Sequence, residues 1–249
     1  MGAAESQPVR NVDKRTARRD HAPLFAAAVE AYRGRPREEP APPLPNRALR
    51  VCVRRRPIFA HETTAGEFDV LTADTTSSIV VHDCRLKPDC RHLFISHHKF
   101  IFDRVYSEAE SGGDVYAAEV RPLVDRVVRG GHATVMMYGQ TGSGKTHTVF
   151  GPPGIMERAG RGEHHIDVHQ DYGLCPRVLI DVFGRLQNMR TSNPGTGYVL
   201  TASAVELSLS GNVDLLTKVP HPGFEAKKPW AAGKAKSKVL SAIPAVARD

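Results

Sequence analysis

The sequence lacks the features of a secreted or membrane-spanning protein. No apolar run approaches the roughly 20 residues that a transmembrane helix needs, and the charged N-terminus has no apolar core of a signal peptide. The four cysteines, Cys52, Cys84, Cys90 and Cys175, are irregularly spaced, so they do not form a disulfide framework. We therefore expect a protein of a reducing compartment, the cytoplasm.

Several recognition patterns are also missing. There are no internal repeats and no coiled coil, and the basic residues lack the interleaved aromatics of a nucleic-acid-binding motif. No nucleophile, base and orienting acid can be assembled. We therefore expect no specific nucleic-acid partner. We also expect no metal cluster, because the spacing of five potential ligands matches neither C-x-x-C nor H-x-x-x-H. These five are Cys84, Cys90, His92, His97 and His98.

The composition is that of a soluble globular protein with basic flanks. Of the 249 residues, 41% are hydrophobic and 24% are charged, with a formal net charge of +7. The positive excess lies in residues 1–50 and 217–249, while the middle of the chain is slightly acidic. Such flanks are usually solvated tails, and the alternative is contact with a polyanion.

These shifts in composition divide the chain into three parts. Residues 1–49 contain a basic tail, with 1–20 expected to lack structure, then an amphipathic helix from Leu24 to Tyr32 and a Pro-rich linker. Residues 50–218 form the folded domain, and 219–249 are a basic, low-complexity tail without a predicted element. We expect the folded part to be of the α/β class, a sheet with flanking helices.

Within the folded part, short apolar runs predict strands and longer periodic segments predict helices. The predicted helices are 114–129, which Gly130 and Gly131 end, and a second helix that Pro176 opens. One run, 133–138, is continuously apolar and is therefore expected to be a buried strand. The other predicted strands are 51–53, 68–71, 79–81, 100–102 and 198–207.

The segment from Gly139 to Thr146, GQTGSGKT, fits the phosphate-binding pattern G-x-x-x-x-G-K-[ST]. Glycines let backbone N–H groups approach phosphate oxygens, Lys145 supplies positive charge for the β and γ phosphates, and Thr146 offers a hydroxyl to Mg²⁺. An apolar run precedes the loop and a helix can begin at Thr146, as the motif requires. The pattern predicts binding of ATP with Mg²⁺, and a merely flexible glycine turn is the alternative.

A hydrolytic enzyme of this class also needs an acid near the metal. Asp181 follows an apolar run and begins a D-x-x-G pattern, but about one such match is expected by chance in this composition. The same residues place Val178, Val182 and Phe183 on one face of a helix, which we favour over a strand. An unrelated P-loop NTPase that uses Asp181 stays as an alternative.

Four segments taken together resemble the kinesin motor domain. They are Arg54–Pro57, Phe100–Asp103, Gly131–Thr134 and Tyr138–Thr148. The octapeptide GQTGSGKT followed by His-Thr is highly specific to that family. The resemblance implies an ATP-dependent protein that binds microtubules and belongs to the cytoskeleton.

Finer features are similar to the kinesin-13 group, the internal-motor microtubule depolymerases. The run Val51–Pro57 is close to the opening strand of that group, and Phe25–Arg35 is similar to the end of its neck helix. Lys87 and Asp89 match the charged tips of its Lys-Val-Asp finger, with Pro88 in place of the valine. The resemblance therefore implies that Lys87 and Asp89 contact tubulin.

The resemblance also implies a set of nucleotide-binding residues. The phosphate loop would hold the phosphates, with Thr146 on Mg²⁺, while residues from elsewhere would frame the adenine. It identifies no catalytic residue in this chain. The implied nucleotide-binding residues are Gly139, Gln140, Thr141, Gly142, Ser143, Gly144, Lys145, Thr146, His147, Arg54, Arg56, Pro57 and Tyr138.

The resemblance covers residues 22–218 and then ends. The sequence contains neither N-x-x-S-S-R-S-H nor D-L-A-G-S-E, the switch segments with which kinesins hold Mg²⁺ and the γ phosphate. We therefore expect a truncated kinesin-like α/β domain that binds ATP and microtubules without hydrolysing ATP. A non-catalytic regulatory fragment that holds nucleotide or tubulin is the alternative, so enzymatic activity stays open.

The first six residues carry one more signal. Met1–Ser6 fits M-G-x-x-x-[ST], the N-myristoylation pattern. A single acyl chain on Gly2 would give a weak membrane contact, to which nearby basic residues would add. An unmodified N-terminus is the alternative.

Overall fold

The structure is a computed structural model that describes residues 14–36, 49–87, 92–161, 171–192, 197–208 and 211–215. The chain divides into two compact units, one ending at Val182 and the other beginning at Phe183. The first unit contains two small sheets and most of the helices, and the second contains the end of a long helix and a hairpin. Each unit is described separately.

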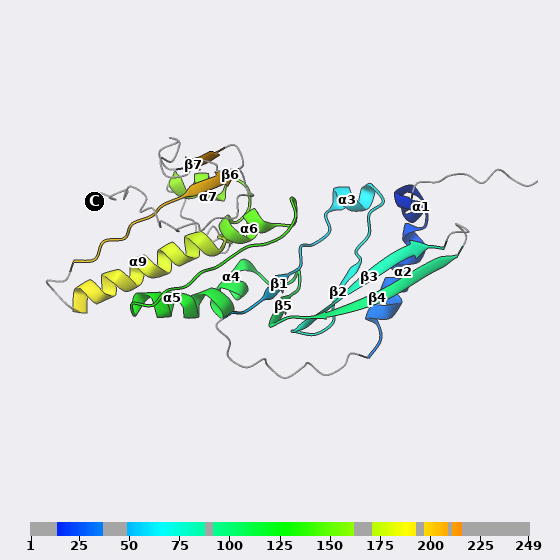
Figure 1. Ribbon diagram of the computed structural model, residues 1–249, viewed down its shortest axis with the longest axis horizontal. Helices are drawn as coiled ribbons and strands as arrows, with labels where there is room; N and C mark the ends of the chain where they lie inside the picture. The colour runs from blue at the N-terminus through cyan, green and yellow to red at the C-terminus, as the bar shows by residue number, and fades with distance from the viewer. Residues whose placement is uncertain are drawn as a thin grey trace, which may run out of the picture. The chain divides into compact units, whose positions relative to one another are not determined.

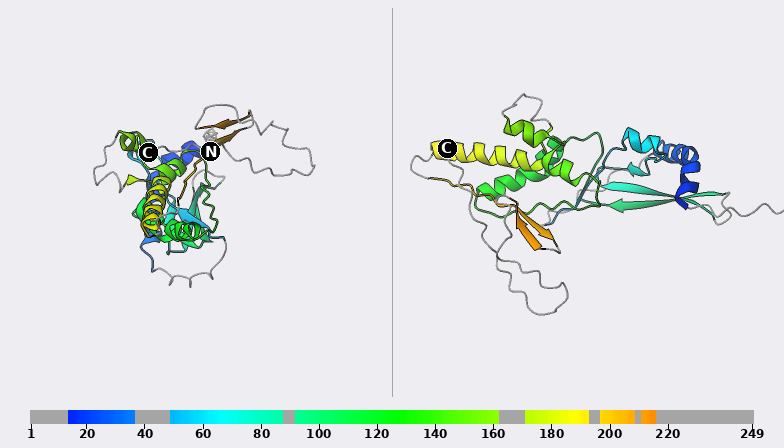
Figure 2. Two further views of the ribbon diagram at one scale, coloured as in Figure 1. Left: turned by 90° about the vertical axis from the view of Figure 1, so that its left-hand side faces the viewer. Right: turned by 90° about the horizontal axis from the view of Figure 1, so that it is seen from above.

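An antiparallel sheet in the first unit carries the N-terminal helices. Its strands are β2 (Leu71–Ala73), β3 (Ser78–Leu86) and β4 (Leu93–Ile101), in the order β2-β3-β4. Figure 1 shows β3 and β4 as a long hairpin beside α2 (Ala22–Arg33), and Figure 2 gives two further views. The predicted amphipathic helix is confirmed as α2, because Phe25 and Val29 pack against Cys84 of β3. From Val80 to Cys84, fully buried and partly buried residues alternate along β3, as the period of a strand requires.

The expectation that residues 1–20 lack structure is wrong for the last seven of them. Lys14–Asp20 form a helix, α1, which continues almost directly into α2. Ala17 is buried, and Arg19 donates to the Glu67 carboxylate at 2.7 Å. These long-range contacts order a segment whose composition alone favours disorder. Residues 1–13, including Gly2, lie outside the described part of the chain.

A second, parallel pair of strands lies at the start of the folded domain. β1 (Cys52–Arg54) pairs with β5 (Arg104–Tyr106), and α3 (Ala60–Thr64) follows β1. The predicted helix at 114–129 is confirmed as three joined segments. They are α4 (Gly112–Val115), a π-helical turn η1 (Tyr116–Val120) and α5 (Arg121–Val128).

This helix shares a core with α9 (Leu174–Ser192), the helix predicted at Pro176. Tyr106, Val115, Val120 and Leu174 are among the buried residues of this core. Asp181 lies on α9 and accepts a hydrogen bond from the Tyr116 hydroxyl at 2.6 Å. The helical interpretation of the segment around Asp181 is therefore confirmed.

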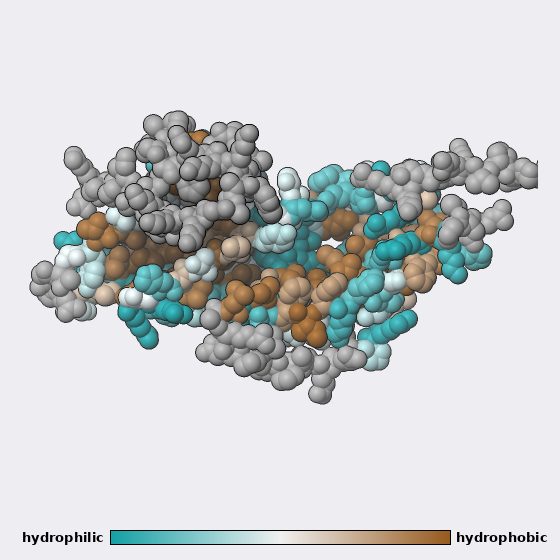
Figure 3. Space-filling view, in the orientation of Figure 1, coloured by the Kyte–Doolittle hydropathy of each residue, from teal (hydrophilic) through white to brown (hydrophobic). Residues whose placement is uncertain are grey.

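The predicted buried strand at 133–138 is not present. Residues 132–140 have no regular secondary structure, and no described strand pairs with them. Val135 is 50% exposed, Met136 80% and Tyr138 98%. Figure 3 shows that apolar residues, in brown, reach the surface on this face of the molecule. A central strand needs neighbours on both sides to satisfy its backbone groups, and the described sheets supply none here.

Two short helices follow the phosphate loop, α6 (Lys145–Phe150) and α7 (Ile155–Gly160). The start of α9 holds the end of α6, since Gly173 N donates to Phe150 O at 3.1 Å. A Cβ at Gly173 would come within 2.5 Å of the backbone of Val149 and Phe150, so this close approach requires glycine. No helix in the described residues is long and apolar enough to cross a membrane.

The second unit contains a hairpin of β6 (Val205–Ser208) and β7 (Gly211–Asp214). The strand predicted at 198–207 is therefore shorter and begins later than expected. Most of the predicted Pro-rich linker, and all residues from 216 onward, lie outside the described residues.

Candidate functional site

A cleft opens between the end of β1 and the phosphate loop. Its volume is about 410 Å³, which is the size of small-molecule sites in proteins. Residues 54–57 and Phe59 form one wall, residues 141–148 form the other, and Glu108 and Glu110 from the turn after β5 complete the lining. Segments that are nearly a hundred positions apart in the sequence thus face one shared space.

The phosphate loop has a backbone shape that depends on its glycines. Gly142 and Gly144 have φ values of 82° and 94°, in the left-handed region that other residues enter at a cost. A Cβ at Gly139 would lie 2.5 Å from the Ser143 hydroxyl oxygen. Gly144 is the N-cap of α6, so Lys145 and Thr146 begin the helix directly after the turn. The local sequence therefore folds as the motif predicts.

Lys145 is held over its own loop. Its ammonium group donates to the carbonyls of Gly139 at 2.7 Å and Gln140 at 2.8 Å. An ammonium has three protons, so one more is available for an acceptor in the cleft that Lys145 lines. These two hydrogen bonds fix the position of the positively charged ammonium relative to the phosphate loop.

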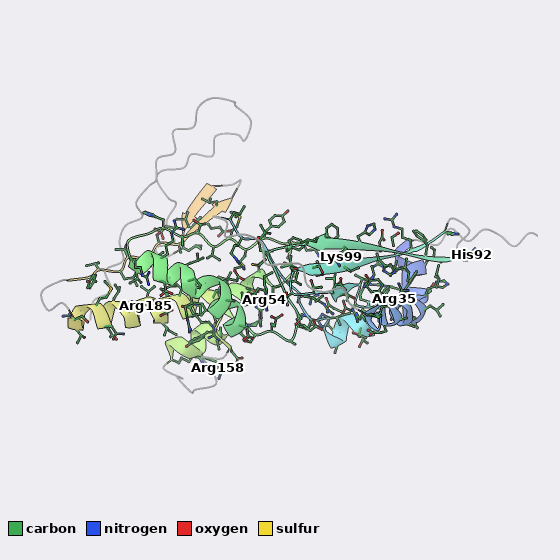
Figure 4. The ribbon with its side chains drawn as sticks, turned by 90° about the horizontal axis from the view of Figure 1, so that it is seen from below. Arg35, Arg54, His92, Lys99, Arg158 and Arg185 are labelled. Atoms are coloured by element: carbon green, nitrogen blue, oxygen red, sulfur yellow. The ribbon has the colours of Figure 1, made fainter. Side chains whose placement is uncertain are left out.

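The opposite wall consists of three consecutive arginines with separate anchors. Arg54, labelled in Figure 4, donates to the Thr148 hydroxyl of α6 at 3.1 Å and so connects the two walls. Burial lowers the pKa of Arg54. Arg55 pairs with Glu108 at 2.9 Å and also with Asp69.

Arg56 is fixed by residues that follow it closely. It pairs with Glu62 at 2.6 Å, and its guanidinium lies 4.6 Å from the centroid of the Phe59 ring. Phe59 itself lines the cleft, so an aromatic face and a cation lie next to each other in this wall. Such a surface suits a planar, electron-rich ring.

The structure brings most of the implied nucleotide-binding residues to one place. Arg54, Arg56 and Pro57 line the cleft, together with residues 141–147. Gly139 and Gln140 lie outside its lining and contribute carbonyls to Lys145. Tyr138 also lies outside the lining and is 98% exposed, because its segment has no strand partner among the described residues.

The other candidate residues lie elsewhere. Lys87 follows β3 directly at the tip of the hairpin, where its N–H donates to His92 O at 2.9 Å, while Asp89 lies outside the described residues. His82 and His97 form a hydrogen bond, but no described group of three or more His, Cys, Asp or Glu side chains could hold a metal ion. Asp181 hydrogen-bonds with Tyr116 and is not part of the cleft lining.

Sequence reasoning missed several lining residues. Thr148 lies next to His147, Phe59 lies two positions after Pro57, and Arg55 lies between two predicted residues, so their nearness was an available signal. Glu108 and Glu110 gave no signal, because their roles depend on pairing with Arg55 and Arg104. Ion pairs across the fold cannot be seen in a local pattern.

The donor set of the cleft fits a nucleoside triphosphate with Mg²⁺. Lys145 and three arginines supply positive charge, the glycine turn gives backbone access, and Thr146 supplies a hydroxyl for a cation. Lys145 would hold phosphate oxygens and Thr146 would contact Mg²⁺, which would neutralise phosphate charge. Arg54, Arg56 and Phe59 would face the base and sugar.

Comparison with known proteins decides the family. A family model described as the kinesin motor domain matches residues 54–241, a range that contains both walls of the cleft. The chain belongs to the kinesin motor domain family. The matched range starts at Arg54, so α1 and α2 precede it, and it extends beyond Lys218. Membership of this family contradicts the alternative of an unrelated P-loop NTPase.

Individual kinesins give the extent of the similarity. The chain is 36% identical over 139 residues to kinesin-like protein KIF24 of Mus musculus and 32% identical over 170 residues to KIF24 of Homo sapiens. These alignments cover 56% and 68% of this chain but 9% and 11% of the relatives, so the chain spans about a tenth of their length. A solved structure of a fast kinesin matches with a TM-score of 0.52 and 26% identity, over 68% of this chain and 40% of that one. The α/β P-loop fold of the kinesin motor is thereby established.

Proposed function

We propose that this chain is an ATP-binding and microtubule-binding member of the kinesin motor family, with Mg·ATP in the cleft. The observation that carries the proposal is the joint position of Lys145 and Arg54–Pro57 around one space, inside the range that matches the kinesin motor domain. The solved fast kinesin, whose description refers to its ATPase mechanism and its interactions with microtubules, supports the same ligands.

Within the family, the kinesin-13 group is the assignment that the sequence supports best. The run Val51–Pro57 includes β1, and the neck-like segment is helical as α2. Lys87, which directly follows β3, and Asp89, two positions later in the sequence, would contact tubulin. This proposal places the protein on the cytoskeleton and gives it the tubulin contacts of a microtubule depolymerase.

The catalytic state follows from the residues around the cleft. The sequence contains neither switch motif, and Asp181 hydrogen-bonds with Tyr116 and lies outside the cleft lining. Ground-state phosphate contacts by Lys145 give binding, while hydrolysis needs donors and an acid aimed at the charge of the transition state. We infer a chain that holds nucleotide and tubulin with negligible turnover, which is the hydrolysis-deficient kinesin expected from the sequence.

Binding of a fluorescent ATP analogue to Lys145→Ala tests the proposal. Loss of a charge-assisted contact worth about 1.5 to 3 kcal/mol should weaken affinity by about 10- to 150-fold. Lys99→Ala is the matched control, because Lys99 pairs with Asp74 at 2.9 Å on the other sheet and does not line the cleft. Equal affinity of Lys145→Ala and the unaltered chain would refute the site.

A further inference from the structure

A single carboxylate joins the N-terminal helix to the wall of the cleft. One oxygen of Asp69, Oδ2, accepts from the Arg33 guanidinium of α2 at 2.7 Å and also from the Arg55 guanidinium. The other oxygen, Oδ1, accepts from Leu71 N at 3.0 Å, which fixes the carboxylate at the start of β2. Asp69 therefore lies between a residue of α2 and a residue of the cleft wall.

Both arginines also have partners other than Asp69. Arg33 donates to the Thr72 hydroxyl at 3.1 Å, to Leu71 O at 2.8 Å and to Glu30 at 2.5 Å, so its guanidinium has one position on the sheet. Arg55 has a side chain that is only 10% exposed, and its other partner is Glu108. Arg55 and Glu108 both line the cleft. The charged groups thus run without a gap from α2 to the nucleotide site.

Because Arg33 and Arg55 share the Asp69 carboxylate, the position of Arg33 affects the electrostatic potential in the cleft. When Arg33 is in place, it neutralises part of the Asp69 charge, and Arg55 keeps more of its positive potential toward the cleft. Without Arg33 beside it, the full negative charge of Asp69 would act on Arg55 and on the cleft that Arg55 lines. A nucleoside triphosphate is strongly anionic, so it should bind more weakly when Arg33 is not beside Asp69.

We propose that Asp69 couples the docking of α2 to nucleotide binding. The docked helix raises nucleotide affinity through Arg33 and Asp69, and bound nucleotide in turn holds α2 on the sheet, since coupling between two sites is reciprocal. This coupling rests on the proposed function, because it requires a nucleotide in the cleft. It assigns α2, which precedes the kinesin-matched range, a role in controlling the motor site.

A double-mutant cycle with a fluorescent ATP analogue tests the coupling in the full chain. Arg33→Gln should weaken affinity about fivefold, at the low end of typical coupling between sites. In the Asp69→Asn background, Arg33→Gln should change affinity less than twofold, because the charge through which it acts is gone. Arg33→Lys keeps a positive charge beside Asp69 and should retain most of the affinity even where packing of the helix end is altered.

Arg19→Gln is the matched control. It removes an ion pair of the same length, 2.7 Å, which fastens α1 through Glu67, and neither residue lines the cleft. Affinity should stay within twofold of that of the unaltered chain. An equal loss in Arg19→Gln and Arg33→Gln would overturn the coupling, because it would show a general effect of loosening the N-terminal helices.

Hydrogen exchange gives the reciprocal measurement. The ATP analogue should slow exchange of the α2 amides in the unaltered chain and leave them unchanged in Asp69→Asn. Nucleotide binding without any change in α2 would overturn the coupling while leaving the proposed function intact. Failure of the unaltered chain to bind the analogue would instead refute the proposed function, and the coupling with it.

Discussion

The three arginines that follow β1 have three different anchors although they are consecutive in sequence. Arg54 contacts Thr148 of α6, Arg55 contacts Asp69 and Glu108, and Arg56 contacts Glu62. Family resemblance implied that Arg54 and Arg56 bind the nucleotide, and both line the cleft. The partners could not be predicted, because most of them are distant in sequence and depend on the completed fold.

The left-handed conformation of Gly144 gives a prediction for the phosphate loop. Gly144→Ala introduces no clash, since the nearest atoms to its Cβ belong to Arg56 at 3.9 Å, but the φ of 94° costs an L-residue about 1 to 2 kcal/mol. The loop should shift to relieve this strain, and nucleotide affinity should fall by about tenfold.

Gly130→Ala is the control for this substitution. Gly130 has a similar φ of 89°, its Cβ would meet nothing within 4 Å, and it does not line the cleft. Thermal melting should show similar destabilisation of the two variants, while titration with an ATP analogue should show weaker binding for Gly144→Ala alone. Equal affinities would mean that the loop conformation does not matter for binding.

A buried histidine also sets a property at this scale. His82 is 1% exposed and lies between the Thr72 hydroxyl and His97 Nδ1, each at 2.7 Å, with the ring of Tyr32 against it. Burial, together with His97 and Arg33, lowers the pKa of His82 to about 4. A hydrogen bond between two Nδ1 atoms needs one protonated and one bare nitrogen, so it is lost when both rings are charged.

This lowered pKa predicts a pH dependence of stability. Between pH 4 and about 6.5 the unfolded chain binds a proton at His82 that the folded chain does not bind, so stability rises with pH across this window and then levels off. The slope is at most about 1.4 kcal/mol per pH unit for one proton. Chemical unfolding of the unaltered chain and of His82→Gln should give a stability difference that grows from pH 5 to 6.5. A difference independent of pH would contradict the lowered pKa.

At the scale of elements, success and failure of the sequence analysis have one physical cause. The helix at 114–129 and the strand at 79–81 were predicted correctly, because each buries its apolar face against a neighbour that the described chain contains. The segment 133–138 is equally apolar, but its predicted strand requires sheet neighbours that the described strands do not provide. The hydrophobic periodicity of a segment indicates which of its faces can be buried. Whether that face is buried depends on whether neighbouring strands or helices are there to pack against it.

The exposed segment 133–138 makes Met136 a test of this interpretation. Met136→Lys should change the free energy of unfolding by no more than about 0.5 kcal/mol, because the side chain is 80% exposed. The same change should reduce aggregation, since it adds a charge to an uncovered apolar run. Chemical unfolding and light scattering would measure the two effects.

A buried position provides the comparison for Met136. Val80 is fully buried in β3, so Val80→Lys should prevent stable folding. Destabilisation of Met136→Lys by several kcal/mol would show that the segment is packed in solution, and that the strand prediction from the sequence was correct.

At the scale of the whole molecule, the proposed nucleotide site offers groups for ground-state phosphate contacts and few of the groups that we expect hydrolysis to need. The chain matches 40% of the fast kinesin chain, and the residues that match the kinesin motor domain, 54–241, include the phosphate loop and the arginine wall. The cleft lining contains two carboxylates, Glu108 and Glu110, and both are engaged by arginines, Arg55 and Arg104. An acid already paired with a guanidinium is poorly suited to activate a water.

We therefore predict that this chain binds ATP but releases phosphate at a background rate, with or without microtubules. Removing one preorganised donor from a comparable site costs about 10²- to 10³-fold in rate, and here no switch motif supplies any of them. Phosphate release by the purified chain and by Lys145→Ala should be indistinguishable, although only the unaltered chain binds the ATP analogue tightly. Microtubule-stimulated phosphate release that Lys145→Ala abolishes would contradict the prediction. It would require a carboxylate in the cleft that is not paired with an arginine. Glu108 would be the first to test, because its partner Arg55 also pairs with Asp69, the residue that contacts Arg33 of α2.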